Sequence, residues 1–156
     1  MVADGAAADE ATRDAVLHGA RVVRADDTEA ALLLGRELAG VDDAVDAAAQ
    51  LLAEGPEVVA LAVGSEGNVV AWRGGHVVMP LFAGEPVDPT GGGDAFTAGL
   101  AAALLRGEDP ETAAWWGAAA AGMTVGHLGG RPDLDLPRLR EAARRVRRAH
   151  GQDGDG

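Results

Sequence analysis

The sequence predicts an α/β protein whose mostly parallel sheet includes a β-hairpin. Short runs of branched apolar residues alternate along the chain with longer stretches in which apolar residues recur at helical spacing. One run, residues 58–63, is apolar at every position, which is typical of a parallel strand buried on both faces. Two further runs, 68–72 and 76–79, are separated by a pair of glycines and predict the hairpin.

Length and composition indicate one domain with a sizeable core. The chain has 156 residues, 47% of them hydrophobic, and a net charge of −12. Such an acidic chain is a poor partner for nucleic acid, which is bound by surplus Lys and Arg. All thirteen basic residues are arginine, so a phosphate loop that depends on lysine is excluded. Because cysteine, a long apolar run and a basic leader are all absent, we expect a cytoplasmic protein without disulfides or a membrane span.

The first part of the chain is predicted to be a tail followed by alternating helix and strand. Residues 1–10 are small and acidic and are expected to form a disordered tail, with a short helix over 11–19. A strand over 21–24 leads into the helix-start residues 26–29. The helix that begins there is expected to carry apolar residues at helical spacing as far as Leu38.

A second amphipathic helix precedes the apolar strand at 58–63. Its apolar residues recur from Val41 to Leu52, and it is expected to end at Gly55. Residues 64–67 then turn the chain into the hairpin strands.

Three helices are predicted after the hairpin. The first runs from Asp94 to about Leu105 with small residues between its apolar positions, which suits close packing. The second opens with Asp109 as a cap and a proline at its first position, and it extends to about Val125. The third covers about 137–150, its arginines interpreted as a solvated face beside an apolar stripe, and residues 151–156 are expected to be a flexible tail.

A glycine-rich turn at residues 88–93 carries the clearest chemistry. Gly91, Gly92 and Gly93 let backbone N–H groups approach a ligand, and the following helix directs its positive end to the same place, so phosphate is the expected ligand. Asp94 would repel an anion if the turn only bound phosphate, but it suits a base that takes a proton from an attacking hydroxyl. The pairing predicts phosphoryl transfer. The alternative is an ordinary glycine turn with Asp94 as a helix cap.

The run from Asp88 to Leu100 resembles the second signature of the ribokinase-like (PfkB) carbohydrate kinases, D-x-x-G-A-G-D-x-F-x-x-G, with Gly92 in place of the alanine. The resemblance implies a ribokinase-like three-layer α/β/α sandwich, of which residues 11–150 would be the C-terminal portion. It implies that the amides of Gly91, Gly92 and Gly93 form the anion hole and that Asp94 is the catalytic base. Asp88 and Thr90 resemble the residues that hold K⁺ in potassium-activated members.

Other segments extend the resemblance over roughly residues 17–148. Asp26 and Glu29 occupy the place of an N-x-x-E motif, which implies that they help to hold Mg²⁺, with Asp26 replacing the asparagine. Gly64 and Gly67 resemble the T-x-G-x-x-G turn along the nucleotide, although Ala62 replaces the threonine. Ala118 stands where many relatives have an asparagine beside the adenine.

The resemblance implies ATP- and magnesium-dependent phosphorylation of a hydroxyl on a sugar or sugar-like substrate. The sugar-binding aspartate, the glycine hinge and the β-lid of the family's first half are absent from this chain. We therefore expect the chain alone to be a poor kinase. A truncated gene, a fragment of a longer protein and one piece of a split enzyme are the alternatives, and the expected partner is a separate N-terminal half or a second copy. A nucleoside or vitamin kinase of the same superfamily and a non-catalytic nucleotide-binding fragment are the alternatives.

Overall fold

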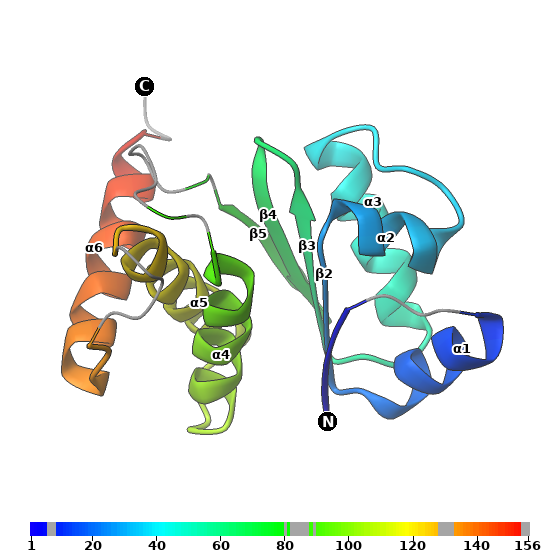
Figure 1. Ribbon diagram of the computed structural model, residues 1–156, viewed down its shortest axis with the longest axis horizontal. Coiled ribbons are helices and arrows are strands. Elements are labelled where there is room, and N and C mark those ends of the chain that lie inside the picture. Colours follow the sequence, from blue (N-terminus) through cyan, green and yellow to red (C-terminus); the bar gives the residue numbers. More distant parts are fainter. Residues whose placement is uncertain (6–8, 80, 82–87, 89, 128–132, 154–156) are drawn as a thin grey trace. The chain divides into compact units, whose positions relative to one another are not determined.

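The computed structural model describes residues 1–5, 9–79, 81, 88, 90–127 and 133–153 (Figure 1). The chain divides into two compact units, Met1–Leu81 and Phe82–Gly156.

The first unit is a five-stranded sheet in the order β1-β2-β3-β4-β5. β1 pairs with β2 and β2 with β3 in parallel, whereas the β3–β4 and β4–β5 pairs are antiparallel. The strands are β1 (Val2–Asp4), β2 (Val22–Ala25), β3 (Val58–Val63), β4 (Gly67–Trp72) and β5 (Gly75–Met79). The predicted α/β architecture, with parallel strands and a hairpin, is confirmed.

Helices make the parallel crossovers of this sheet, and short turns make the antiparallel connections. α1 (Glu10–Gly19) joins β1 to β2, and α2 (Asp27–Leu34) with α3 (Val41–Ala53) joins β2 to β3. The pairing register places Val23 opposite Val59 and Val59 opposite Ala71. These residues therefore share one face of the sheet, where they form a buried core with residues of all three helices, among them Leu17, Leu33 and Leu51.

Two features of this unit differ from the sequence prediction. Val2–Asp4 form a strand on the edge of β2, where a disordered tail over residues 1–10 was expected. Three residues ending in an aspartate show no strand periodicity, and only the open edge of β2 gives their backbone partners. α2 ends at Leu34 because Gly35 takes a left-handed C-cap with φ 70°, so Leu38 lies outside the helix, although it still packs against the core.

The second unit consists of α4 (Gly92–Leu104), α5 (Pro110–Val125) and α6 (Leu136–Asp153). α4 and α5 approach closely through glycines: a Cβ on Gly99 would lie 2.7 Å from the Trp116 carbonyl oxygen, and one on Gly117 2.9 Å from that of Phe96. The small residues that the sequence shows in both helices are thereby explained.

The ends of these helices agree in part with prediction. Asp109 caps α5, its Oδ1 accepting the Thr112 N–H at 2.9 Å, and Pro110 is the first helical residue, as expected. α6 extends to Asp153, past the predicted end at 150. Among the described residues, no helix combines the length and apolar character that a membrane span requires.

Candidate functional site

The turn before α4 is an open cradle of backbone amides. Gly91 is the N-cap of α4 with φ 79°, a left-handed conformation that favours glycine, and it offers no side chain to the helix start. Ala95 N–H bonds to the Gly91 carbonyl oxygen at 2.9 Å, so the N–H groups of Gly92, Gly93 and Asp94 precede the first helical hydrogen bond and have no helical acceptor. An anion here would meet these donors and the positive end of the helix.

Asp94 is the third residue of α4, and its side chain is exposed. Among the residues that the structure describes, none forms a hydrogen bond or an ion pair with its carboxylate. The N-cap position belongs to Gly91, so the alternative in which Asp94 merely caps the helix is wrong. A carboxylate next to open amides and without a protein partner is available to accept a proton from a bound hydroxyl.

Asp88 and Thr90 anchor the turn to the C-terminal end of α5. Asp88 Oδ1 accepts the Thr90 N–H at 2.9 Å, and the Asp88 N–H donates to the Val125 carbonyl oxygen at 3.0 Å. A Cβ on Gly92 would lie 2.8 Å from Val125 Cγ1, so the turn packs directly on that helix end. Pro89, between the two predicted residues, lies outside the described part of the chain.

Sequence reasoning missed Thr124 and Val125 as parts of the cradle. Thr124 is buried, and its Cγ2 would lie 3.8 Å from a Cβ on Gly91. Both residues end a helix rich in alanine and glycine, and nothing in that pattern says which loop packs against its end. Only the antiparallel packing of α4 on α5 brings them to the glycine turn.

Ala118 is half-buried on α5. Two helical turns separate it from Val125, so the two residues lie on nearly the same side of the helix, about 10 Å apart along its axis. A methyl group at this position can pack against a ligand but cannot make the polar contact of an asparagine.

The start of α2 contains the two predicted magnesium residues in a capping box. Asp26 Oδ1 accepts the Glu29 N–H, and Glu29 Oε2 accepts the Asp26 N–H, each at 2.8 Å. Glu29 Oε2 also lies 3.7 Å from Arg24 Nη1, which in turn lies 3.2 Å from Asp4 Oδ1. Each carboxylate keeps its second oxygen out of the capping box.

These oxygens suit Mg²⁺, which keeps several waters and is usually held by one or two carboxylates. Within the described residues, no three His, Cys, Asp or Glu side chains converge as a ready-made metal cage. The donor set of Asp26 and Glu29 is therefore compatible with a magnesium ion bound largely through water.

The Gly64–Gly67 turn follows β3 and has positive φ at both glycines, 47° and 125°. Residues 64–66 border a cavity of about 540 Å³, whose other walls include Asp27 and Thr28 in the first turn of α2. The fold thus brings two predicted motifs together at one cavity, although Asp26, Glu29 and Gly67 do not line it.

The predicted site residues thus form two sets, one in each unit. Asp26, Glu29, Gly64 and Gly67 belong to the first unit, and the glycine turn with Asp88, Thr90, Asp94 and Ala118 belongs to the second.

Sequence comparison relates the chain to sugar kinases. Residues 3–137 match the sequence profile of the pfkB family carbohydrate kinase. A ribokinase from Haemophilus influenzae is 31% identical over 113 residues, which cover 72% of this chain and 37% of that protein. A 2-dehydro-3-deoxygluconokinase from Thermoproteus tenax is 33% identical over 138 residues, which cover 88% of this chain and 41% of that protein. The chain thus spans less than half the length of these relatives.

Solved structures give the same relation at the level of the fold. Phosphofructokinase-2 from Escherichia coli, determined in complex with potassium, gives a TM-score of 0.80 at 18% identity, over 94% of this chain and 47% of that one. Ribokinase from Thermotoga maritima gives 0.69 at 26% identity, over 85% and 44%. The expected ribokinase-like fold is confirmed.

Proposed function

This chain belongs to the pfkB family of carbohydrate kinases, and from that premise we propose that it supplies the nucleotide-binding and proton-accepting part of an ATP-dependent sugar kinase. The acceptor is a hydroxyl of a sugar or a sugar-like compound. One observation carries the proposal: the open amides at the start of α4 stand next to a carboxylate, Asp94, that the described protein leaves unpaired.

In the proposed reaction, Asp94 accepts the proton of the substrate hydroxyl as its oxygen attacks the γ-phosphorus of ATP. A new O–P bond forms, the bond from the γ-phosphorus to the bridging oxygen breaks, and ADP leaves with the bonding electrons. The amides of Gly92 and Gly93 donate to the oxygens of the phosphoryl group in transfer, where negative charge is spread. Gly91 contributes its left-handed conformation at the N-cap, which leaves the helix start without a capping side chain.

Further predicted residues are assigned supporting roles in the same proposal. Bound Mg²⁺ supplies positive charge to the phosphates, and the oxygens of Asp26 and Glu29 outside the capping box would hold it through water. The Gly64–Gly67 turn borders the nucleotide, and Ala118 packs against the base without reading its polar edge. Asp88 and Thr90 are the proposed neighbours of a monovalent cation, K⁺.

The acceptor site is the part of the proposal that this chain does not supply. Substrate recognition is assigned to an N-terminal half, because the chain matches less than half the length of its relatives. Positioning of the hydroxyl is worth on the order of 7 kcal/mol or more in such reactions, so turnover by the chain alone is expected to be very low.

Calorimetric titration of the chain with ATP in excess Mg²⁺ tests the proposal directly. Saturable binding with a stoichiometry of about one is expected, together with slow ADP release that a sugar panel accelerates when the missing half is supplied. Binding without sugar-stimulated turnover in the assembled enzyme would instead support the non-catalytic alternative. A folded chain that does not bind ATP would refute the proposal.

A further inference from the structure

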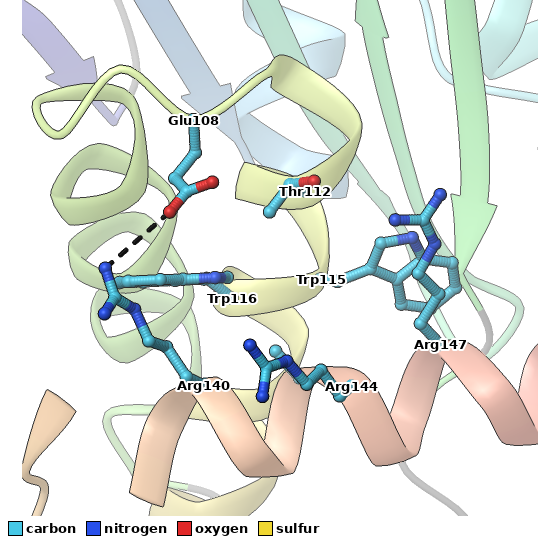
Figure 2. Close-up of a pocket in the computed structure, with 8 residues that line it drawn as sticks. Glu108, Thr112, Trp115, Trp116, Arg140, Arg144 and Arg147 are labelled. Atoms are coloured by element: carbon cyan, nitrogen blue, oxygen red, sulfur yellow. Dashed lines mark ion pairs between the residues drawn. The ribbon is translucent and has the colours of Figure 1, made fainter. Parts of the chain in front are cut away.

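A second cavity lies in the groove between α5 and α6, toward the N-terminal part of α5. The amide cradle, by contrast, packs against the C-terminal end of that helix. The groove encloses about 220 Å³. Figure 2 shows its residues: Glu108, Thr112, Trp115, Trp116, Arg140, Ala143, Arg144 and Arg147.

Three arginines of α6 gather at this groove. Arg140, Arg144 and Arg147 are spaced by four and three residues, so they project from one side of the helix. Two are already engaged: Arg140 Nη2 lies 3.8 Å from Glu108 Oε1, and Arg147 Nη2 lies 2.8 Å from Glu111 Oε1. Within the described part of the chain, Arg144 has no carboxylate partner.

Arg140 is also held by an aromatic ring. Its Cζ lies 5.3 Å from the centroid of the Trp116 ring, a cation–π contact that orients the guanidinium at one end of the groove. Trp116 is 3% exposed, so its ring is not available as a stacking platform for a ligand.

Trp115 leaves a hydrogen-bond donor without an acceptor. The residue is 3% exposed, and its Nε1 is a buried polar atom with no hydrogen-bond partner among the described residues. The ring packs against His150, with 5.2 Å between centroids. A buried indole N–H without an acceptor is costly, and such a group is usually satisfied by a partner.

We propose that this groove binds a small oxyanion, phosphate or the phosphate end of a small phosphomonoester. Arg144 and Arg147 pair with its oxygens. Trp115 lines the groove but its Nε1 is buried, so the indole N–H reports on the site and does not contact the ion. A tetrahedral oxyanion offers oxygens for both guanidinium groups, and the small volume favours it over a nucleotide. The site is separate from the amide cradle and does not depend on the function proposed for that cradle.

The indole N–H of Trp115 provides a local probe of the proposal. In a ¹H–¹⁵N spectrum of the chain, its cross-peak is identified as the one lost in Trp115→Phe. Inorganic phosphate is expected to shift this peak saturably, while sodium chloride at the same ionic strength leaves it in place. Phosphate bound only at the α4 amides would not move this peak, and that result would overturn the proposal.

Matched substitutions on α6 separate a specific site from general attraction of anions. Arg144→Gln is expected to weaken phosphate binding, read from the same peak, by at least about tenfold, because it removes a charge-assisted hydrogen bond. Arg148→Gln removes the same charge from the same helix outside the groove, and it should change the affinity by less than about twofold. Equal weakening by both variants, each shown to be folded by its spectrum, would refute the site. Titration with glycerol phosphate tests whether an ester is accepted as well as the free ion.

Discussion

Helices α2 and α4 both begin with an acidic residue in the first turn, yet their N-termini are built in opposite ways. At α2 the carboxylates of Asp26 and Glu29 each accept a backbone N–H, so the helix start satisfies its own donors. At α4 the N-cap is Gly91, which offers no side chain, and the carboxylate of Asp94 forms no such bond. The first arrangement is closed and the second is open.

The difference shows how one helix end can serve stability and another can serve a ligand. A capped end gains roughly 1 kcal/mol of folding stability, and its donors are no longer available. An uncapped end forgoes that gain and keeps its N–H groups and its dipole for an anion. Acidic residues in a first turn therefore do not identify a binding site by themselves. Whether their carboxylates already accept backbone N–H groups shows if the helix start is free to bind a ligand.

Removing the free carboxylate of the open end should have the largest effect. Asp94→Asn in the enzyme assembled with its sugar-binding part is expected to lower kcat by roughly 100- to 10,000-fold, because asparagine cannot accept the proton. The affinity for MgATP should change by less than about twofold, since the amides remain. Steady-state kinetics and calorimetry measure the two quantities. Near-normal turnover would end the assignment of Asp94 as base.

Adding a side chain to Gly91, the N-cap of α4, should have the next largest effect, a loss of MgATP affinity. Gly91→Ala forces a residue with a side chain into φ 79° at a cost of about 1 kcal/mol, or else the turn moves and misdirects its amides. MgATP binding should weaken by about tenfold or more if two amide hydrogen bonds are lost.

Gly107 provides a matched control for that variant. It also has φ 79°, and no atom would contact an added Cβ within 4 Å. Gly107→Ala should cost similar stability in thermal unfolding and leave MgATP affinity unchanged. Equal losses of affinity in the two variants would show that only backbone strain was measured.

Removing the N-cap of α2 should have a moderate effect on the stability of the fold. Asp26→Ala removes the cap of α2 and should lower the free energy of unfolding by about 1 kcal/mol, whereas Asp26→Asn keeps a capping oxygen and should cost only a few tenths. Chemical denaturation measures both. If the asparagine variant keeps its stability but binds Mg²⁺ more weakly in the presence of ATP, the carboxylate charge serves the metal; unchanged Mg²⁺ affinity would limit Asp26 to capping.

The N-cap of α5, Asp109, is a third acidic helix start. Replacing it should have the smallest effect, a change in stability that depends on pH. The backbone N–H and hydroxyl of Thr112 both donate to Asp109, and the backbone hydrogen bond is the main cause that lowers the pKa of Asp109 below its ordinary value of 3.8. The ionised form is therefore favoured in the folded state. Its contribution to stability is complete above that ordinary value and disappears as the pH falls through the lower folded pKa.

Asp109→Asn should accordingly lower the Tm slightly at pH 7. The difference in Tm between the wild-type chain and the variant should shrink as the pH falls below about 4. Thermal unfolding of both proteins across this range measures it. A difference that stays constant with pH would mean that the cap acts through geometry alone.

Much of this comparison was predictable from local sequence. The capping residues Asp26 and Asp109, the first-turn proline and the glycine turn all act through neighbours three or four positions away, so their patterns predict helix starts correctly. The strand at residues 58–63 was equally clear from its composition.

What could not be predicted depends on partners distant in the chain. β1 exists because β2 offers an open edge, and Thr124 and Val125 belong to the cradle because α5 packs antiparallel to α4. The arginines of α6 were interpreted as a solvated face, and all six are exposed. Three of them nevertheless line a groove, because α6 lies over the two tryptophans of α5.

The sequence by itself determined the order of the helices and of strands β2 to β5, the family and the residue types of the site, because capping, periodicity and glycine conformation act over a few residues. Only the tertiary structure decided that β1 pairs with β2 and that the end of α5 packs on the glycine turn. Those contacts join residues that lie far apart in the chain, and local patterns do not encode them.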